Sequence, residues 1–408
     1  MPDIDTHTPD IVAKLHCRSR HKFHWPTLAS FAIGFLLNLA AAAWAGPYSN
    51  LVIFGDSLSD VGNIAAATFD IYPGPYYYQD RFSNGPVYTE MLSNGLGLGP
   101  SIASTADGSN YAYGGAQTTG TGGFNGIFIR DIDEQVDAFL AAHTPDTNAL
   151  YVVFSGANDF VNGQTNVNIP ANSLSEDIDR LITAGARQFL VMNLPLLGYT
   201  PRYNGNATTA AEFNTRTSSY NAALTAKIDT LEANNPATTF FRLDVAGLFN
   251  AAIANPVAFG LTNVTQPAAP GLEIAASSYD TNQIVANPNE YLFWDELHPT
   301  TTVHTILAGY ALDLVALPGD YNDEQVVDAA DYVVWRDALD QTGFALAADG
   351  NGNGVVDASD YNLWQAHFGQ TIADAASAAL GAVPEPTSLL LLATAATIFL
   401  GRARRQAA

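Results

Sequence analysis

The sequence predicts an α/β fold built around a parallel β-sheet. Short runs rich in β-branched and aromatic residues alternate with longer amphipathic stretches, and this alternation is typical of strands joined by helices in βαβ units. The strand-like runs are residues 51–54, 149–156, 187–195 and 238–245. The helical patterns are residues 132–143, 173–186 and 210–234. Reactive groups gather at the carboxyl ends of the strands in such sheets, so the residues after each run are candidates for chemistry.

The connections between these elements carry two local signals. Ser173 followed by Glu176 predicts a capping box at the start of the second helix. Residues 105–126 are rich in glycine and asparagine and do not fit a regular element. Their glycines allow main-chain N–H groups to approach a ligand closely, so we expect this part of the chain to be a loop that can contribute to a site.

The acidic composition excludes one broad class of partner. The chain has 408 residues, of which 48% are hydrophobic, so a sizeable core is expected. Its formal net charge is -24, from 40 acidic and 16 basic residues, and many of the basic residues lie near the two ends. A surface of this charge repels phosphate backbones, so we expect no nucleic-acid partner.

Residues 1–45 have the pattern of a secretory signal peptide. A basic stretch precedes the apolar run TLASFAIGFLLNLAAAAWA, and Ala43-Trp44-Ala45 fits a cleavage site before Gly46. The alternative is a buried N-terminal helix. The only cysteine, Cys17, lies in this segment. The mature chain is therefore expected to use neither cysteine catalysis nor a cysteine-based metal site, and to form no disulfide.

The stretch LVIFGDSLSDVGN places Ser57 just after the first predicted strand. A serine hydroxyl is a poor nucleophile and needs a base within hydrogen-bond distance. His298 follows Asp295 by three residues, a spacing at which the acid can orient the imidazole and stabilise the imidazolium that forms. Histidine can accept and return a proton near neutral pH. Of the other histidines between residues 46 and 317, His304 is expected to support the site from a helix and His143 to face solvent.

Attack on an ester would create an oxyanion that needs positioned donors. The sequence offers three candidates. The Ser57 N–H is expected at the start of the following helix, and the Asn158 side-chain amide stands at the end of another strand. The third is a main-chain N–H of Gly114 or Gly115, and the register of the motif favours Gly115.

Four blocks, FGDSLSD, NYAYGGA, GAND and DELHPT, carry these residues in order along the chain. They resemble the blocks of the GDSL, or SGNH, hydrolases from about residue 48 to residue 316. The segments FGDSLSDVGN and RFSNGP resemble its branch of secreted lipases, phospholipases and plant-type enzymes. The resemblance implies a flavodoxin-like three-layer α/β/α sandwich and ester hydrolysis by a triad of Ser57, His298 and Asp295. It also implies an oxyanion hole made by Ser57, Gly115 and Asn158, and no cofactor for catalysis.

Residues 318–370 contain two copies of one motif, 29 residues apart. Each copy offers oxygen ligands at the positions that bind calcium in an EF-hand loop. The second copy offers Asp349, Asn351, Asn353, the Val355 carbonyl, Asp357 and Asp360, with Gly354 where the loop must turn. The first copy offers Asp320, Asn322, Glu324, the Val326 carbonyl, Asp328 and Asp331. Gln325 replaces the glycine in this first loop, so weak or no calcium binding is expected there.

The C-terminal part of the chain also carries two resemblances. The tandem loops resemble a dockerin, which implies calcium-dependent folding and a cohesin-like receptor; a calcium-stabilised stalk without a partner is the alternative. An Ala-rich linker, residues 371–382, leads to residues 383–408, where Pro-Glu-Pro precedes a short apolar stretch and an arginine cluster. This tail resembles a PEP-CTERM sorting signal, which implies transient membrane contact and delivery to the exterior or envelope of a Gram-negative-like cell.

The main hypothesis is therefore a secreted serine esterase or lipase, with a catalytic domain at residues 46–317 and a calcium-binding appendage. Its substrate would be a lipid, a short-chain ester or an acetylated sugar. The aromatic and proline-rich segment 72–86 is expected to form an acyl-binding wall, a lid or a buried plug. Two alternatives stay open, namely a carbohydrate acetyl esterase of a polysaccharide-degrading system and a non-catalytic surface scaffold that retains the fold.

Overall fold

A computed structural model describes residues 47–120 and 125–371 of the chain. The predicted signal peptide, Cys17, the sorting tail and all but the first residue of the predicted linker lie outside these ranges. Within them, no helix combines the length and the apolar character that crossing a membrane requires.

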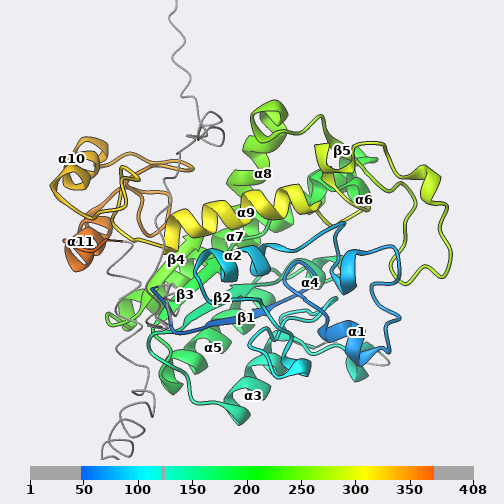
Figure 1. Cartoon of the computed structure of the whole chain (residues 1–408), viewed down its shortest axis with the longest axis horizontal. Coiled ribbons are helices and arrows are strands. Elements are labelled where there is room, and N and C mark those ends of the chain that lie inside the picture. The colour runs from blue at the N-terminus through cyan, green and yellow to red at the C-terminus, as the bar shows by residue number, and fades with distance from the viewer. Residues whose placement is uncertain (1–46, 121–124, 372–408) are drawn as a thin grey trace, which may run out of the picture. The chain divides into compact units, whose positions relative to one another are not determined.

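The centre of the fold is a parallel four-stranded sheet with the order β1-β2-β3-β4 (Figure 1). All four strands lie within the predicted runs or extend them by one residue. Their bounds are β1 Leu51–Gly55, β2 Leu150–Phe154, β3 Gln188–Met192 and β4 Thr239–Leu243. Helices cover both faces, so β1 and β2 are buried at every position, which explains their continuous apolar sequence.

The glycine-rich segment adds to the sheet beside β1. Its described residues, 105–120 and 125–126, form no strand of their own, but Tyr111 N donates to Ile53 O at 2.7 Å and Tyr113 N donates to Gly55 O at 3.1 Å. A parallel bridge joins Ile53 and Asn110. With this segment counted first, the spatial order is that of flavodoxin-like sheets, as the resemblance implied.

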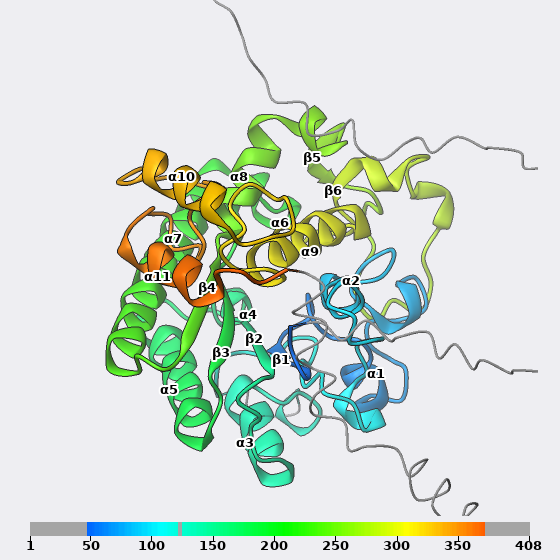
Figure 2. The same cartoon turned by 60° about the vertical axis from the view of Figure 1, so that its left-hand side comes forward.

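The helices form the two outer layers of the sandwich. On one face lie α3, α5 and α7, and on the other lie α2 and α9 (Figures 1 and 2). The helices are α1 Asn63–Ala67, α2 Tyr88–Gly95, α3 Ile132–Ala142, α4 Ala157–Val161, α5 Asn168–Ala184, α6 Pro201–Asn204, α7 Ala207–Asn234, α8 Val245–Ala254, α9 Thr301–Val315, α10 Ala329–Ala338 and α11 Ala358–His367. A small parallel pair, β5 Asn263–Pro267 and β6 Tyr291–Phe293, precedes the predicted histidine block.

The predicted start of α5 is wrong. The helix begins at Asn168, so Ser173 lies inside it and cannot be its N-cap. The Ser173 hydroxyl instead donates to Thr118 O at 3.4 Å. Pro170 lies in the first turn of the helix, where proline is tolerated because its missing N–H would have no helical partner.

The C-terminal repeat folds into two similar loop-helix units that pack on each other. Trp335 Nε1 donates to Asp357 O of the second unit, and Trp364 Nε1 donates to Asp328 O of the first, both at 2.7 Å. The repeated tryptophans therefore serve the same purpose in both copies. The second loop also contacts the edge strand of the central sheet, since Arg242 N of β4 donates to Asn351 O at 2.8 Å.

Candidate active site

The chain turns sharply where β1 ends, and Ser57 sits in that turn. Ser59 N and Asp60 N both donate to Asp56 O at 3.0 Å, which closes the turn around the serine. The expectation that Ser57 begins a helix is wrong, because α1 starts only at Asn63. The Ser57 N–H has no hydrogen-bond partner within the described part of the chain and remains available to a ligand.

The structure brings Ser57, His298 and Asp295 together as the sequence predicted. His298 Nε2 lies 3.0 Å from Ser57 Oγ, and His298 Nδ1 lies 2.7 Å from Asp295 Oδ2. Residues 241 positions apart thus meet because β6 delivers the DELHPT loop to the end of β1. All three side chains are buried, with 6%, 2% and 3% of Ser57, His298 and Asp295 exposed. This is the geometry of a nucleophile, a base and an orienting acid.

Asp295 is held ionised by its surroundings. Burial alone would raise the pKa of Asp295, but the charge of His298 and hydrogen bonds from His298 and Tyr77 outweigh it and hold the pKa below its usual value. Asp295 Oδ1 accepts from Leu297 N and His298 N, both at 2.7 Å. The carboxylate is therefore fixed in one orientation and stays charged next to the imidazole.

Tyr77 is a site residue that the sequence analysis did not identify. Its hydroxyl donates to Asp295 Oδ2 at 2.7 Å. Phe82, from the same aromatic segment, packs 5.1 Å from the His298 ring between centroids. Both side chains are buried, whereas Tyr72 and Tyr78 of this segment are exposed. The buried-plug interpretation therefore fits Tyr77 and Phe82.

The geometry separates the two glycines that the sequence left open. Gly114 N donates to Asp60 Oδ2 at 2.7 Å, so it is not available to a ligand. Gly115 has a φ of 85°, which favours glycine, and its N–H has no partner among the residues of known placement. Asn158 Nδ2 donates one hydrogen to Ala116 O at 2.9 Å, which leaves its second hydrogen free beside Gly115.

Asp60 joins the serine block to the glycine block. Its carboxylate accepts from the N–H groups of Gly62, Asn63 and Ile64 as well as Gly114, at 2.7 to 3.1 Å. The Asn63 side chain adds a second link, because its amide donates to the carbonyl groups of Asn110 and Ala112. These contacts fix Gly115 relative to Ser57.

Several carboxyl groups near Ser57 are buried and form no ion pair with any described residue. Burial raises the pKa of Asp56, Asp60 and Asp159 to about 6 each, although backbone hydrogen bonds to their charged forms oppose the shift. Asp159 accepts from Thr118 N at 3.0 Å and Thr118 Oγ1 at 2.8 Å, and so fixes the start of α4 next to Asn158. These acids hold loops in place at an electrostatic cost.

The other two histidines occupy the positions expected of them. His304 is buried in α9, its Nδ1 accepts from Tyr88 N at 3.3 Å, and burial lowers its pKa to about 3. It therefore stays neutral and supports α2. His143 is exposed at the end of α3. Neither lies where it could accept the Ser57 proton.

Both predicted calcium loops adopt the same conformation. Asp349 accepts from Asn353 N at 3.0 Å and Gly354 N at 2.7 Å, and Asp320 accepts from Glu324 N at 3.1 Å and Gln325 N at 2.7 Å. Gln325 has a φ of 71°, close to the 85° of Gly354, so the first loop turns despite lacking glycine. Oxygens of Glu324, Asp328 and Asp331 lie within 4.8 Å of one another.

The sequence matches a family model described as GDSL-like Lipase/Acylhydrolase over residues 51–310. It is similar to the phosphatidylcholine-sterol acyltransferase of Aeromonas hydrophila, with 27% identity over 313 aligned residues that cover 67% of this chain and 91% of that protein. It is also similar to the esterase EstA of Pseudomonas aeruginosa, with 30% identity over 328 aligned residues that cover 69% of this chain and 49% of that protein. The chain therefore spans about half the length of this second relative.

Several solved protein structures resemble the structure of this chain. One is Axe2, an acetylxylan esterase from Geobacillus stearothermophilus, with 14% identity and a TM-score of 0.36. The similarity covers 66% of this chain and 94% of that one.

Proposed function

The chain belongs to the family of GDSL-like lipases and acylhydrolases, and from this premise we propose that it hydrolyses carboxylic esters with Ser57 as the nucleophile. The observation that carries the proposal is the 3.0 Å contact between Ser57 Oγ and His298 Nε2, continued by the 2.7 Å contact between His298 Nδ1 and Asp295. Both contacts are made by buried side chains at the carboxyl end of β1.

The reaction begins when Ser57 Oγ attacks the ester carbonyl carbon and its proton moves to His298 Nε2. Asp295, already ionised, stabilises the imidazolium and keeps the proton of Nδ1 in place. The tetrahedral oxyanion is met by the N–H groups of Ser57 and Gly115 and by the Asn158 amide. His298 then protonates the leaving alcohol, and an acyl-enzyme ester on Ser57 remains.

Water completes the cycle by the reverse sequence of proton transfers. His298 takes a proton from the attacking water, the same donors stabilise the second oxyanion, and the Ser57–acyl bond breaks as the serine recovers its proton. Each step uses only side chains and main-chain groups of this chain. The products are the carboxylic acid and the alcohol.

The test compares the wild-type protein with Ser57→Ala on p-nitrophenyl esters. We expect the rate to fall by about a thousandfold or more, as the loss of a triad nucleophile does elsewhere. A fluorophosphonate probe should label the wild-type serine and not the variant. Undiminished hydrolysis by Ser57→Ala, or no labelling of the wild type, would reject the proposal, and the absence of labelling would favour a non-catalytic scaffold.

Calcium binding by the C-terminal repeat is a second part of the proposal. The carboxylate, amide and carbonyl oxygens of both loops are the hard ligands that calcium prefers. The fit is supported by backbone N–H groups that hold Asp349, Asp360, Asp320 and Asp331 in matching orientations. When bound, calcium would supply charge neutralisation and order to the module, and it would take no part in ester hydrolysis.

Export and partner binding complete the proposal. The signal-peptide pattern and the PEP-CTERM-like tail support delivery to the exterior or the cell envelope, with transient membrane contact by the tail. The dockerin-like repeat supports a cohesin-like receptor as a partner. These features rest on sequence patterns, and their direct test is fractionation of cells that express the full chain with and without residues 383–408.

A further inference from the structure

A cavity of about 850 Å³ has Tyr113 and Ile129 in its wall, and both lie close to Gly115 of the proposed oxyanion hole. Ile129, in its wall, would lie 3.0 Å from a Cβ atom placed on Gly115. Tyr113, also in the wall, is two residues before Gly115 and bonds to the end of β1 through Gly55. These two residues place one wall of the cavity against Gly115.

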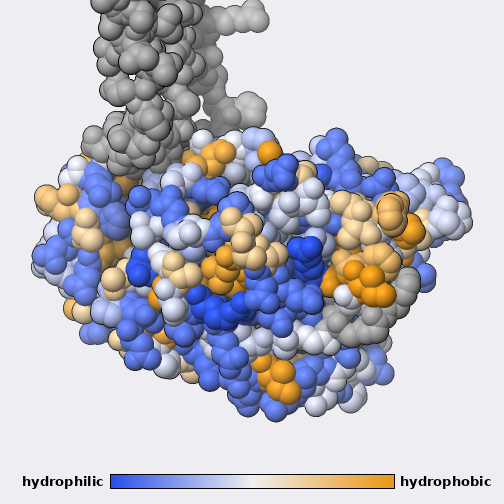
Figure 3. Space-filling view, turned by 90° about the horizontal axis from the view of Figure 1, so that it is seen from below, coloured by the Kyte–Doolittle hydropathy of each residue, from blue (hydrophilic) through white to orange (hydrophobic). Residues whose placement is uncertain are grey.

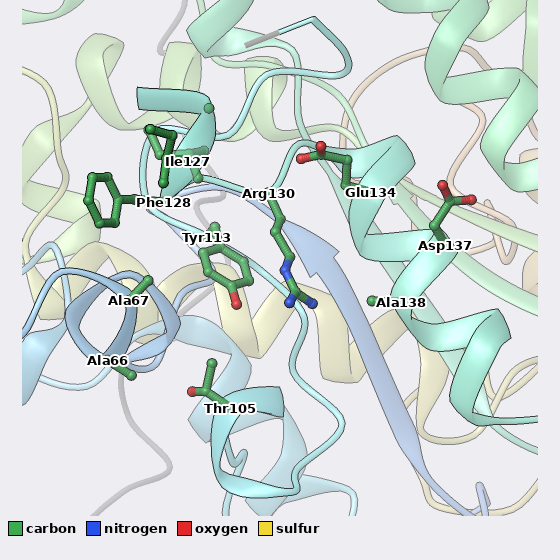
Figure 4. A pocket seen from close by; sticks show the side chains of 12 residues that line it. Ala66, Ala67, Thr105, Tyr113, Ile127, Phe128, Arg130, Glu134, Asp137 and Ala138 are labelled. Atoms are coloured by element: carbon green, nitrogen blue, oxygen red, sulfur yellow. The ribbon is translucent and has the colours of Figure 1, made fainter. Parts of the chain in front are cut away.

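Arg130 is the cation of this cavity, and no carboxylate of the described residues forms an ion pair with it (Figure 4). Its guanidinium lies 5.9 Å from the centre of the Tyr113 ring. The two acids of the cavity wall are already engaged elsewhere. Glu134 accepts from Asp131 N at 3.1 Å, and Asp137 forms an ion pair with Arg180.

The backbone of Arg130 is anchored to the serine strand. Gln135 Nε2 donates to both Arg130 O at 2.8 Å and Gly55 O at 2.9 Å, while Gln135 Oε1 accepts from Gly55 N at 2.9 Å. Gln135 is fully buried on α3. The Gln135 side chain thus fixes the backbone of Arg130 relative to Gly55, the last residue of β1, which lies two residues before Ser57.

The rest of the cavity wall offers an apolar surface. Ala66, Ala67, Ile127 and Ile129 line it, and the Ile127 side chain is 72% exposed. Elsewhere the surface seen in Figure 3 is largely hydrophilic, with separate apolar patches. A cavity that combines apolar side chains with an arginine that forms no ion pair among the described residues suits a ligand that has both an anionic group and a hydrocarbon part.

We propose that Arg130 binds an anionic group of the ester substrate, so that this enzyme prefers esters carrying a phosphate or carboxylate near the scissile bond. The inference rests on the proposed ester hydrolysis. The net charge of -24 does not prevent it, because charges beyond a Debye length of about 8 Å are largely screened at physiological salt, whereas Arg130 would contact the anion directly.

The experiment measures kcat/KM for matched pairs of soluble esters. One pair is tributyrin and dibutyryl phosphatidylglycerol, which share butyryl esters of glycerol and differ where the third butyryl group is replaced by a glycerol phosphodiester. The other pair is an acetylated galacturonic acid and its neutral methyl ester, which differ in a carboxylate. The proteins are wild type, Arg130→Gln, Arg130→Lys and the matched charge control Lys227→Gln, which lies on α7 outside the cavity.

We expect Arg130→Gln to lower the ratio of anionic to neutral kcat/KM by about tenfold to a hundredfold for at least one pair, the range for losing a hydrogen bond to a charged group. Arg130→Lys should restore part of the ratio, and Lys227→Gln should leave it unchanged. Added salt should weaken the preference of the wild type more than that of Arg130→Gln, which a purely structural role would not produce. A response in one pair only would identify phosphate or carboxylate as the recognised group.

An unchanged ratio in Arg130→Gln for both pairs would overturn the inference while ester hydrolysis stands. An equal fall in Lys227→Gln would also overturn it, because the effect would then reflect net charge. If the wild type hydrolyses none of the four esters but still hydrolyses a p-nitrophenyl ester, the inference fails and the proposed function stands; if it hydrolyses neither, both fail.

Discussion

The hydroxyl of Tyr77 donates to Asp295 Oδ2 at 2.7 Å, on the same oxygen that faces His298 Nδ1. The two residues are 218 positions apart. A buried carboxylate that shares one oxygen between an imidazole and a phenol is fixed more firmly than one held by the histidine alone.

Replacing Tyr77 by phenylalanine should slow catalysis without abolishing it. The loss of one hydrogen bond to a charged group costs about 1.5–3 kcal/mol, so kcat should fall about tenfold to a hundredfold. The pKa of Asp295 should rise because one stabilising donor is gone. Steady-state kinetics with a p-nitrophenyl ester measure the effect. Tyr78→Phe, which changes an exposed neighbour, is the control, and equal effects in both variants would contradict a specific role for Tyr77.

Replacing Asn158 by alanine tests the oxyanion hole. The variant removes a side-chain donor that stands beside Gly115. The activation free energy should therefore rise by about 2.7–4 kcal/mol, which lowers kcat about a hundredfold to a thousandfold, while KM changes little. Ser57 should still react with a fluorophosphonate, though more slowly, because the triad is intact. A KM effect with normal kcat would instead assign Asn158 to substrate binding.

Much of this site could be predicted from the sequence, because its strands and its Asp295–His298 pair are set by residues that are close together in the chain. The runs that became β1 to β4 are continuous and apolar because both sheet faces are covered, and the Asp295–His298 spacing fits within one turn. Tyr77 could not be predicted, because an aromatic-rich segment does not show which hydroxyl points inward. Gln135 left a signal that was not used, since it is a polar residue within the apolar stripe of Ile132, Val136 and Phe139 on α3.

The oxyanion donors were harder to place. Gly114 and Gly115 are indistinguishable by composition, and only the bond from Gly114 N to Asp60 separates them. The helix expected at Ser57 was wrong because Asp56 closes a tight turn with its carbonyl group instead. In both cases a carboxyl-bearing residue of the serine block decides the backbone geometry, through contacts that spacing alone does not reveal.

The protein should be more stable near pH 5 than near pH 7.5 when calcium is removed. Asp56, Asp60 and Asp159 have pKa values of about 6 in the folded chain and 3.8 as the reference, so the folded state binds more protons between these values. The part of the free energy of unfolding that comes from these three acids therefore falls as pH rises through this window, by about 1.4 kcal/mol for each pH unit between the two pKa values of one group. His304, whose pKa burial lowers to about 3, opposes this fall as one group against three. Urea unfolding in EDTA at several pH values measures the slope.

Asp56→Asn supplies the matched variant for this pH dependence. Asp56 Oδ1 accepts from Leu58 N at 3.0 Å, a bond that an asparagine oxygen can keep. The slope of stability against pH should become shallower in this variant, whereas Asp107→Asn, at an exposed site, should leave it unchanged. Stability that rises between pH 5 and pH 7.5 in EDTA would contradict the proposed burial cost.

Calcium should raise the melting temperature of the whole protein, including its catalytic part. A ligand that binds only the folded state stabilises it by about 2.7 kcal/mol at a hundred times its Kd. Asn351 would bind calcium with its side chain, while its carbonyl group accepts from Arg242 N on β4. Calcium that orders the second loop should therefore also stabilise the edge strand of the sheet. Thermal unfolding followed by circular dichroism, with calcium or with EDTA, measures the shift.

The two loops should differ in their share of this shift. Asp349→Ala should remove most of the calcium-dependent rise in melting temperature and Asp320→Ala less of it. The reason is that Gln325 holds the first loop in a backbone conformation that costs a non-glycine residue about 1 kcal/mol or more. Ester hydrolysis at low temperature should change little on adding EDTA, since the proposed reaction uses no calcium. A melting temperature that does not respond to calcium would remove the metal from this account, and equal effects of the two variants would show that both loops bind alike.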